Sequence, residues 1–426
     1  MNKTAGLLLA GGVGSRLGVL ASLRTKPAVP FGGIYRIIDF ALSNAANSGI
    51  DHLGILTQYK PLSLMDHIGV GKDWGYGSRL RSLKILPPRT GEKDSDWYKG
   101  TADAVRQNME YVTQNPDCDT LVILSGDHIY QMDYREIVAF HKARGAKLTL
   151  ATREVAIEDA HHFGIAKVNS ENKIVEWAEK PRKPKSTLAS MGIYVFSIDF
   201  IKEAFREIKG TDFGMDIIPW ACELGHAYAF PFSGYWRDVG TLKSYWSANI
   251  DLLDANSGLH LEDWKIYTNS RDDTRLGDRP PSFVGRDCEV KNSVVSQGCE
   301  INGCIENSII SPGVTVQHGA SIKNSIIMDA CTIGADAQLD RVILDKNVTI
   351  GDGVSIGEGT DDVLNREYPD FLESGISIVG KGSHVPGKCR IGKHCIIKPF
   401  TPTSSFQSNT IEGGETVGAV PHEYST

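Results

Sequence analysis

The sequence predicts a two-part protein, with an α/β domain containing a mainly parallel sheet followed by a parallel β-helix. Three observations predict this architecture. Up to about residue 250, short apolar segments alternate with helical patterns, as in βαβ units. A glycine-rich turn follows the first apolar segment directly. Beyond about residue 283, single aliphatic residues recur every five or six positions, as in hexapeptide-repeat β-helices.

Size and composition narrow the class of protein. The chain has 426 residues, which suits two or three domains, and its 41% hydrophobic content supports a sizeable core. Its net charge is −7 with acids and bases interspersed, so we expect no nucleic-acid partner. No apolar stretch approaches the ~20 residues that span a bilayer, so no membrane partner is expected. The eight cysteines form no CxxC motif and are interpreted as reduced thiols of a cytoplasmic protein.

The elements of the α/β domain follow from the apolar runs. Predicted strands are 7–9, 53–57, 120–124 and 147–151, and predicted helices lie near 40–48 and 134–144. Ligands of such sheets bind at the carboxyl ends of the strands. The glycine-rich turn and Asp127 both follow predicted strands directly, and we expect both at the site.

The C-terminal repeat has a period of about sixteen residues. Copies of the motif begin at Asn292, Asn307, Asn324 and Asp340, spaced 15, 17 and 16 residues apart. Each face of a triangular coil contributes one inward aliphatic, and its corners need Gly, Asn or Asp. The predicted inward residues are Val284, Val290, Val295, Ile301, Val316, Ile322, Ile327, Ile333, Leu339, Leu344, Ile350 and Ile356, then, after an inserted loop at about 358–375, Ile378, Val385, Ile391 and Ile396. The expected domains are 1–250, a connector 251–281, and the β-helix 282–426.

The loop from Ala10 to Arg16 is the strongest local signal in the α/β domain. Its three glycines let the backbone approach a polyphosphate, whose oxygens the N–H groups can bind. Arg16 adds a fixed cationic fork, and Lys26 is a second cation candidate. The spacing is neither that of a Walker A loop nor that of the dinucleotide fingerprint. Taken alone, such a turn can equally be a tight strand-to-helix connection.

Two aspartates are candidate metal ligands. Asp127 ends a predicted strand, where a carboxylate suits Mg²⁺, although an aspartate there can also cap a helix. Asp238 supplies a second carboxylate if its segment folds back to the first. Lys180 can neutralise a sugar phosphate or simply be solvated. Trp97 and Tyr98 precede a predicted helix and suit either a lid over a ligand or the core.

Taken in order, these segments resemble the ADP-glucose pyrophosphorylase family. Residues 10–29 match the family's N-terminal signature, 97–105 its second and 189–195 its third, and 31–44 also match. The resemblance covers nearly the whole chain. It implies a Rossmann-like nucleotidyltransferase domain with a mainly parallel mixed sheet, then a left-handed parallel β-helix for assembly and regulation, in a homotetramer.

The resemblance also implies residue roles. Arg16, Lys26 and Asp127 would be catalytic, and Asp127 with Asp238 would bind Mg²⁺. Gln58 and Trp97 would couple a regulator site to the substrate site, and Arg24 and Arg36 are candidates for binding a regulatory anion. ATP would contact Ala10, Gly11, Gly12, Gly14, Ser15 and Arg16. Glucose 1-phosphate would contact Tyr98, Gly164, Glu179, Lys180 and Ser190.

The implied reaction transfers AMP from ATP to glucose 1-phosphate, giving ADP-glucose and pyrophosphate for glycogen or α-glucan synthesis. The sugar phosphate is already ionised near neutral pH, so no general base is needed. It attacks the α-phosphorus in line, opposite the leaving pyrophosphate. Catalysis would then consist mostly of positioning and charge neutralisation.

Two departures from the family pattern affect regulation and nucleotide choice. Leu23 replaces a lysine that helps some bacterial members to bind a sugar-bisphosphate activator. The stretch 86–90, Leu-Pro-Pro-Arg-Thr, lacks the Gln-Gln found near the nucleotide base in many members. Selectivity for adenine is therefore inferred from the overall match.

Three alternative functions stay open at this point. A sibling enzyme would use another nucleoside triphosphate on the same scaffold. A catalytically silent regulatory subunit is a second alternative, although Arg16, Lys26, Asp127 and Lys180 are all intact. In a third, the β-helix would be an acyltransferase with a histidine base. We interpret His318, His384 and His394 instead as surface or corner residues.

Overall fold

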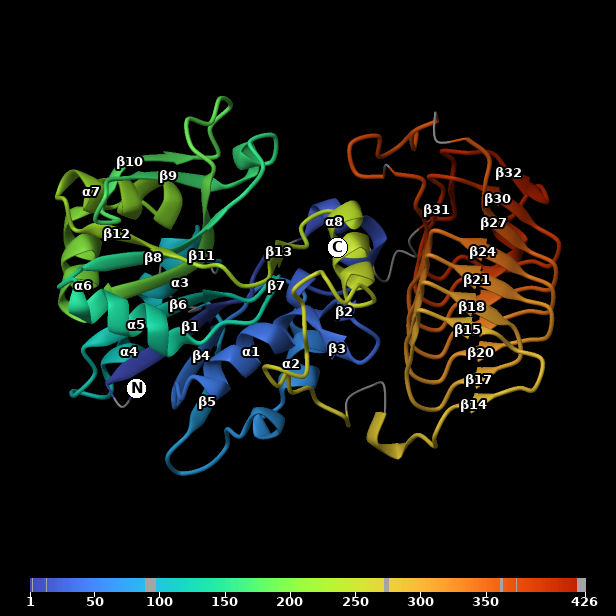
Figure 1. Ribbon diagram of the computed structural model, residues 1–426, viewed down its shortest axis with the longest axis horizontal. Helices are drawn as coiled ribbons and strands as arrows, with labels where there is room; N and C mark the ends of the chain where they lie inside the picture. The colour runs from blue at the N-terminus through green and yellow to red at the C-terminus, as the bar shows by residue number, and fades with distance from the viewer. Residues whose placement is uncertain are drawn as a thin grey trace.

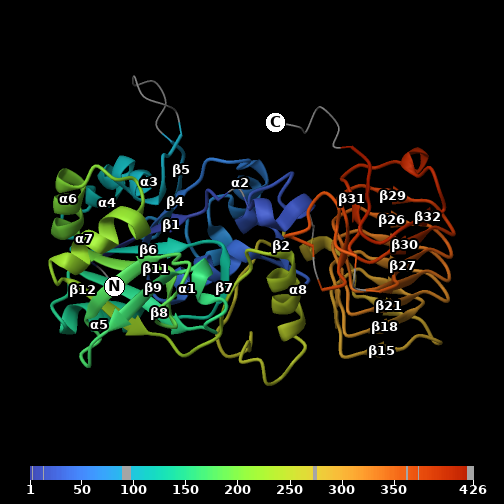
Figure 2. The ribbon, with the colours of Figure 1, turned by 90° about the horizontal axis from the view of Figure 1, so that it is seen from above.

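A computed structural model describes residues 1, 3–12, 14–88, 97–271, 276–360, 363–372 and 374–419. These ranges leave out Val13, residues 89 and 90 of the 86–90 stretch, part of the connector and the last seven residues of the β-helix domain. Figures 1 and 2 show an α/β body beside a regular β-helical stack, with α8 and β2 between the two. The predicted fold class is confirmed.

The α/β domain is built on a mixed sheet with the order β10-β9-β11-β6-β1-β4-β5, in which β8 joins β11 to β12. Strands β6, β1, β4 and β5 run parallel, and β11 is antiparallel to β6 and β8. The predicted strands correspond to β1, β4, β6 and β8. The sheet strands are β1 (Thr4–Leu9), β4 (His52–Leu56), β5 (Ser82–Leu86), β6 (Thr120–Ser125), β8 (Leu148–Glu154), β9 (Gly164–Val168), β10 (Ile174–Glu179), β11 (Leu188–Ser197) and β12 (Ala227–Pro231).

Local side-chain bonds set where several helices begin. At the start of α1, the Asp39 carboxylate accepts from the N–H of the N-cap residue Arg36 at 2.9 Å. Asp133 and Thr241 are themselves N-cap residues, and their side chains accept from N–H groups in the first turns of α5 and α8. The predicted helices correspond to α1 and α5. The helices are α1 (Ile37–Asn47), α2 (Leu62–Ile68), α3 (Thr101–Gln107), α4 (Met109–Thr113), α5 (Tyr134–Ala143), α6 (Ile198–Glu207), α7 (Ile218–Glu223) and α8 (Leu242–Asp251).

Short elements complete the domain and bring its loops together. Two small antiparallel pairs join β2 (Pro30–Phe31) to β3 (Tyr35–Arg36), and β7 (His128–Tyr130) to β13 (Trp236–Asp238). The 3-10 helices are η1 (Ser15–Leu20), η2 (Lys26–Ala28), η3 (Lys72–Trp74), η4 (Ala160–His162), η6 (Leu276–Asp278) and η7 (Thr403–Ser405), and a π-helix, η5, spans Phe213–Ile217.

The β-helix consists, in the described residues, of three parallel sheets that stack coil on coil. The first contains β14 (Phe283–Val284), β17 (Glu300–Ile301), β20 (Thr315–Val316), β23 (Thr332–Ile333), β26 (Thr349–Ile350) and β29 (His384–Val385). The second contains β15 (Val290–Lys291), β18 (Cys304–Glu306), β21 (Ser321–Lys323), β24 (Gln338–Asp340), β27 (Ser355–Glu358), β30 (Arg390–Gly392) and β32 (Thr410–Ile411). The third contains β16 (Val294–Val295), β19 (Ile309–Ile310), β22 (Ile326–Ile327), β25 (Val342–Leu344), β28 (Ser377–Val379), β31 (Ile396–Ile397) and β33 (Thr416–Val417).

Most of the predicted inward aliphatics fill the coil interior, but four do not. Val284 and Val290 are exposed, because they lie on the first coil and have no coil beneath them. Ile378 and Ile396 face the α/β domain, and their neighbours Val379 and Ile397 fill the interior. Neighbouring residues of a strand point to opposite faces of the sheet. In a pair of adjacent aliphatic residues, one therefore fills the coil interior and the other packs against the α/β domain.

The alignment of the fourth repeat was wrong by one residue. Ile343 pairs with Ile326, so Arg341 rather than Asp340 is the counterpart of Asn324. Arg341 takes the left-handed corner conformation with φ of 53°, as Asn324 does with φ of 48°. The repeats therefore follow the sheet register rather than the first polar residue of each motif.

The third sheet of the β-helix packs on the α/β domain. Its outward residues Ile326, Ile343, Ile378 and Ile396 share one apolar cluster with Phe31 and Leu242. A buried ion pair crosses the same contact, with Arg24 Nη2 2.9 Å from both oxygens of Asp345. The β-helix is thus joined directly to the segment that follows the glycine-rich loop.

Three further sequence interpretations can be compared with the structure. All eight cysteines lie in the described residues, and all are free thiols. In the described part of the chain, no helix has both the length and the apolar character to cross a membrane. His318 and His384 are exposed, as expected, and His394 is a corner residue with φ of 58° but does not lie at the surface. His394 is buried beneath the inserted loop, with one ring nitrogen 2.7 Å from the Gly375 N–H and the other 2.8 Å from the Val363 carbonyl.

Candidate active site

The glycine-rich loop leaves the end of β1 and curls around Lys26. Gly14 has a φ of 67°, and a Cβ there would lie 2.9 Å from the Cβ of Lys26, so only glycine fits. The Thr25 hydroxyl donates to the Gly12 carbonyl at 3.1 Å and ties the loop to the lysine segment. Ala10 is buried, whereas Gly12, Ser15 and Arg16 are exposed. The loop therefore presents open backbone and one guanidinium beside a buried ammonium.

Asp127 and Asp238 meet, although 111 positions separate them in the sequence. Asp127 immediately precedes β7, and Asp238 ends β13, which pairs with β7 so that His128 lies opposite Asp238. The Ser125 hydroxyl donates to Asp127 in a short hydrogen bond. One candidate ligand atom from each of Asp127, His128 and Asp238 lies within 4.8 Å of the others. The arrangement suits a divalent cation.

Lys26 bridges the two carboxylates. Its Nζ lies 3.0 Å from Asp127 Oδ2 and 2.8 Å from Asp238 Oδ1, and its side chain is buried. Burial alone would lower the pKa of Lys26, but the two carboxylates outweigh burial and raise it. Burial would raise the pKa of both aspartates, but the nearby Lys26 ammonium, with His128, outweighs it, so that the pKa of Asp127 lies well below its usual range and that of Asp238 is also lowered. All three groups are therefore charged at neutral pH.

A cleft of about 290 Å³ opens on the glycine-loop side of this centre. Gly11, Gly12, Tyr98 and Asp127 are among its lining residues. Gln58 also lines it, and its side-chain oxygen accepts from the Tyr98 N–H at 2.8 Å. The neighbouring Trp97 is 54% exposed. Gln58 thus holds the segment that carries both aromatic residues against the cleft.

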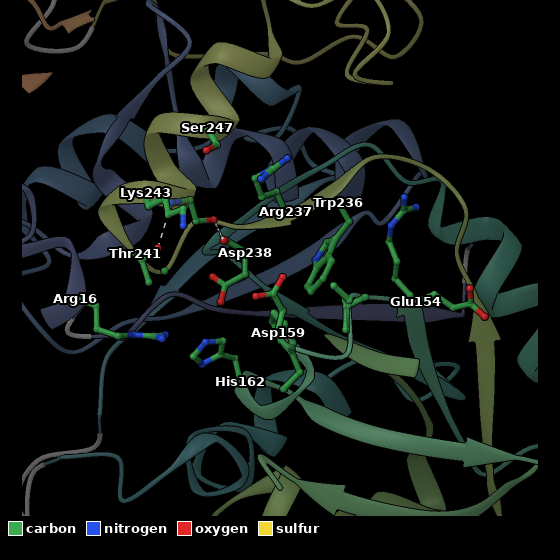
Figure 3. A pocket seen from close by; sticks show the side chains of 16 residues that line it. Arg16, Glu154, Asp159, His162, Trp236, Arg237, Asp238, Thr241, Lys243 and Ser247 are labelled. Carbon is green, nitrogen blue, oxygen red and sulfur yellow. Dashed lines mark hydrogen bonds between the residues drawn. The ribbon is translucent and has the colours of Figure 1, made fainter. Parts of the chain in front are cut away.

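A second cleft, of about 470 Å³, opens on the other side of Asp238. In Figure 3, Arg16 and His162 point toward one another, with Asp238 nearby and Trp236 on the far wall. A Cβ on Gly240 would lie 2.9 Å from Arg16 Nη2 and 3.1 Å from the Asp238 carboxylate, so glycine permits their close approach. Burial and the nearby charges of His161 and Arg16 lower the pKa of His162. This cleft is polar and rich in cations.

The residues predicted to bind a sugar phosphate fall into two groups. Gly164 and Glu179 are register partners on β9 and β10, and burial raises the pKa of Glu179. Lys180 follows with φ of 43°, is largely exposed, and has its Nζ 3.9 Å from Glu179. Ser190 lies on β11, where its hydroxyl accepts from the Gly192 N–H at 3.2 Å. Tyr98 lies apart from this group, in the glycine-loop cleft.

The two arginines predicted to bind a regulatory anion are both buried. Arg24 is paired with Asp345, as described above, so an anion there would compete with that carboxylate. Arg36 donates from Nη1 to the Ser63 hydroxyl at 2.8 Å and to the Ala28 carbonyl at 3.2 Å. Neither guanidinium lies at an open surface in this conformation.

Sequence reasoning missed two residues beside the carboxylates, His128 and Trp236. His128 follows Asp127 directly, and Trp236 Nε1 donates to His128 Nδ1 at 3.3 Å. The signal was in the sequence, because both residues lie within two positions of a predicted metal ligand. Only the pairing of β7 with β13 brings them together.

Comparisons with known proteins agree with this geometry. Residues 5–255 match the nucleotidyl transferase family, and residues 280–379 match the GlmU-like C-terminal hexapeptide family. The glucose-1-phosphate adenylyltransferase of Fervidobacterium nodosum is 47% identical over 93% of this chain and 95% of its own. The protein of that name from Acetivibrio thermocellus is 43% identical over 96% of this chain and 96% of its own. The one from Thermotoga maritima is 43% identical over 98% of this chain and 99% of its own. The chain therefore belongs to the glucose-1-phosphate adenylyltransferases, within the nucleotidyl transferase family.

Proposed function

We propose that this protein transfers AMP from ATP to glucose 1-phosphate, releasing pyrophosphate and forming ADP-glucose for glycogen or α-glucan synthesis. The observation that carries the proposal is the meeting of Asp127, Asp238 and Lys26 between two clefts, one of which contains the glycine-rich loop. Reaction at one phosphorus requires that both substrates be held beside one charged centre. The named relatives supply the identities of the substrates.

The nucleotide would bind in the glycine-loop cleft. Backbone N–H groups of Gly11, Gly12, Gly14 and Ser15 would bind phosphate oxygens, next to the buried Ala10. Arg16 would neutralise the departing pyrophosphate, because it follows the last glycine of the glycine-rich loop by two residues and its guanidinium lies close to Asp238. Lys26 would release the carboxylates and bind the nucleotide phosphates, since its ammonium is charged and adjacent to the loop.

Glucose 1-phosphate would bind near Gly164, Glu179, Lys180 and Ser190, with Tyr98 approaching from the glycine-loop side. Lys180 is exposed and so is available to the sugar phosphate. Glu179 is partly buried against Gly164, where its carboxylate could accept from sugar hydroxyls. The phosphate oxygen would then attack the α-phosphorus in line, with no protein base required.

The donor set of the centre fits Mg²⁺, which prefers one or two carboxylates together with phosphate oxygens. Asp127 and Asp238 would hold it. When bound, Mg²⁺ neutralises charge that develops on the phosphates. Lys26 occupies the space between the carboxylates, and its displacement would accompany metal and nucleotide binding.

We infer that the β-helix serves assembly and regulation, in a cytoplasmic homotetramer with the domain division 1–250, 251–281 and 282–426. The contact through Arg24 supports a regulatory route, because Arg24 lies two residues before Lys26. Arg24 and Arg36 would bind the regulatory anion after rearrangement. Gln58 and Trp97 would pass the change to the nucleotide cleft, since Gln58 holds the backbone beside Trp97.

The test measures pyrophosphate release from purified protein with Mg²⁺ and glucose 1-phosphate, comparing ATP, UTP, dTTP, GTP and CTP. We expect a clear preference for ATP. Preference for another nucleoside triphosphate would leave the proposed mechanism unchanged but show that ATP is not the substrate. Absence of release with all five, from folded protein, would favour a silent regulatory subunit and overturn the proposal.

A further inference from the structure

His128 lies beside the two aspartates, and its imidazole is held by a tryptophan. The spacing of Asp127, His128 and Asp238 is that of a three-residue metal-ligand set. The hydrogen bond from Trp236 contradicts that interpretation of His128. We propose that Trp236 fixes the tautomer of His128 whose Nε2–H faces Asp127 and Asp238. His128 is then a positioning residue that orients the metal-binding carboxylates without binding the metal.

The tautomer follows from the chemistry of the donor. Trp236 Nε1 lies 3.3 Å from His128 Nδ1, and an indole nitrogen only donates. Nδ1 must therefore present its lone pair, so the ring proton lies on Nε2. A nitrogen that carries a proton has no lone pair for a metal ion. Neither ring nitrogen of His128 is then available as a ligand.

The packing holds both rings in this orientation. His128 is buried, and its ring meets Trp236 edge-on with 5.4 Å between centroids. Trp236 also packs on Phe163, with 5.3 Å between centroids. His128 is fixed in addition by its place on β7, opposite Asp238 on β13. Rotation of the imidazole would break the contact with Trp236 and leave its polar edge buried.

The second nitrogen points at the charged centre. Nε2 lies 3.5 Å from Asp127 Oδ1 and 3.7 Å from Asp238 Oδ1. An N–H dipole aimed between two carboxylates stabilises both in one orientation. Lys26 faces the same pair of carboxylates, and Ser125 donates to Asp127. At these distances the His128 N–H makes an electrostatic contact with the carboxylates rather than a hydrogen bond, and it adds to the closer contacts from Lys26 and Ser125.

The consequence is selectivity for hard cations. Imidazole nitrogen favours Zn²⁺ and related ions, whereas carboxylate and phosphate oxygens favour Mg²⁺ and Mn²⁺. By occupying Nδ1, Trp236 keeps His128 out of the ligand set and leaves that set all oxygen. This inference rests on the proposed function, in which Asp127 and Asp238 bind the metal.

The first test measures Mn²⁺ affinity by electron paramagnetic resonance, using the full chain with an ATP analogue whose α,β-bridge is methylene. His128→Leu should weaken Mn²⁺ binding by about 10- to 100-fold, as loss of an outer-shell donor does. His128→Gln keeps an N–H near the Nε2 position and should stay within about threefold of the wild type. His226→Leu, which alters a histidine packed on Phe200, is the control and should change nothing.

Two outcomes of that test overturn the inference and differ in what else they overturn. If folded His128→Leu binds Mn²⁺ as the wild type does, His128 orients nothing, and the metal site survives. If the wild type itself binds no Mn²⁺, the proposed metal site fails and the inference fails with it. Thermal unfolding of each variant establishes that it is folded.

A second test addresses the tautomer itself. Nitrogen NMR of histidine-labelled wild-type protein, with the His128 signal assigned by its loss in His128→Gln, should show the proton on Nε2. A proton on Nδ1 would overturn the inference without any metal present.

The third test frees the tautomer. Trp236→Phe keeps an aromatic ring but removes the indole N–H donor, so His128 Nε2 can become a metal ligand. Zn²⁺ affinity should rise by about tenfold while Mn²⁺ affinity falls. Trp220→Phe, on a tryptophan stacked on Phe200, is the matched control. Unchanged affinities for both ions in Trp236→Phe would contradict the proposed role of the indole.

Discussion

The charged side chains at the centre of the α/β domain come from distant segments of the chain, whereas the asparagines at one corner of the β-helix contact equivalent asparagines in the neighbouring coils. Lys26, Asp127 and Asp238 converge from three separate segments of the chain. Asn292, Asn307 and Asn324 form a corner ladder, with side-chain bonds of 3.1 and 2.8 Å between successive coils. The first arrangement concentrates charge at one point, and the second spreads small neutral bonds along a stack. A substitution should therefore alter chemistry in the first region and stability in the second.

The contact between the two regions combines both properties. Arg24 and Asp345 form a buried pair of opposite charges, one from each domain. Asp345 also accepts from the Lys346 N–H at 2.7 Å, so its carboxylate is fixed by the β-helix itself. Changes at this pair should affect stability and, through the neighbouring Lys26, catalysis.

The largest effect should follow Asp127→Asn, because the variant loses a carboxylate charge at the reacting centre. We expect kcat to fall by about 10²–10³-fold or more, with little change in KM for glucose 1-phosphate, in a variant that still unfolds cooperatively. Pyrophosphate release and calorimetry measure these quantities. The control is Asp340→Asn at the end of strand β24 of the β-helix, which should keep wild-type kcat. Near-normal turnover of Asp127→Asn would show that the metal assignment is wrong.

The next largest effect should come from breaking the interdomain pair. Arg24→Met or Asp345→Ala should each lower the free energy of unfolding by about 3–5 kcal/mol, because each leaves a buried charge without its partner. The double variant should lose less than the sum. Urea unfolding provides the measurement, with Lys323→Met beside the exposed Glu306 as a control costing at most about 1 kcal/mol. Equal losses of unfolding free energy in the variants of the exposed pair and of the buried pair would show that the Arg24–Asp345 pair does not stabilise the contact between the domains.

Substitutions of two adjacent aliphatic residues in the third sheet should affect two different apolar clusters, the β-helix interior and the contact between the domains. Ile343→Ala and Leu344→Ala should each cost about 2–5 kcal/mol, since both side chains are fully buried. Leu344→Ala should destabilise the coil, whereas Ile343→Ala should loosen the domain contact. Hydrogen exchange of α8 distinguishes them, because Leu242 shares a cluster with Ile343 but not with Leu344. Faster exchange of α8 in Leu344→Ala alone would reverse the two assignments.

Acid should weaken the α/β domain through His141. Burial, the largest cause, lowers the pKa of His141 from 6.5 to about 4. Between these values the unfolded chain binds more protons, so stability is full above about pH 6.5 and falls toward pH 4. The loss should be roughly 2–3 kcal/mol. Urea unfolding from pH 7 to 4 measures it, and His141→Gln should flatten the slope. An unchanged slope would show that another group is responsible.

The smallest effect should follow a change in the asparagine ladder. Asn307 has a φ of 49° and bonds to both neighbouring asparagines. Asn307→Ala should cost about 1–2 kcal/mol, and Asn307→Gly about half of that, because glycine tolerates the backbone conformation. Thermal unfolding measures both, and kcat should not change. A large loss of kcat in Asn307→Ala would break the proposed division between the two regions.

Local patterns in the sequence predicted the elements and the repeat. The apolar runs that became β1, β4, β6 and β8 and the periodic aliphatics needed only neighbouring residues to be recognised. The same is true of Gly14, whose positive φ belongs to the loop that contains it. These features are local because strand formation and coil corners depend on a few consecutive dihedral angles.

Other features depended on contacts between distant segments. The burial of His394, the outward orientation of Ile378 and Ile396, and the exposure of Val284 follow from what packs beside each residue. Tyr98 lies in the glycine-loop cleft, where Gln58 holds its backbone. No periodicity within the chain records these neighbours.

The sequence by itself thus determined the two-part fold, the glycine-rich loop after the first strand and the identity of the charged residues. The tertiary structure alone decided that Asp127 and Asp238 share Lys26, that Trp236 restricts His128, and that Arg24 pairs with Asp345. The physical reason is that charge pairing and tautomer choice act through space over a few ångströms. Chain order does not specify such distances until the sheets have brought the segments together.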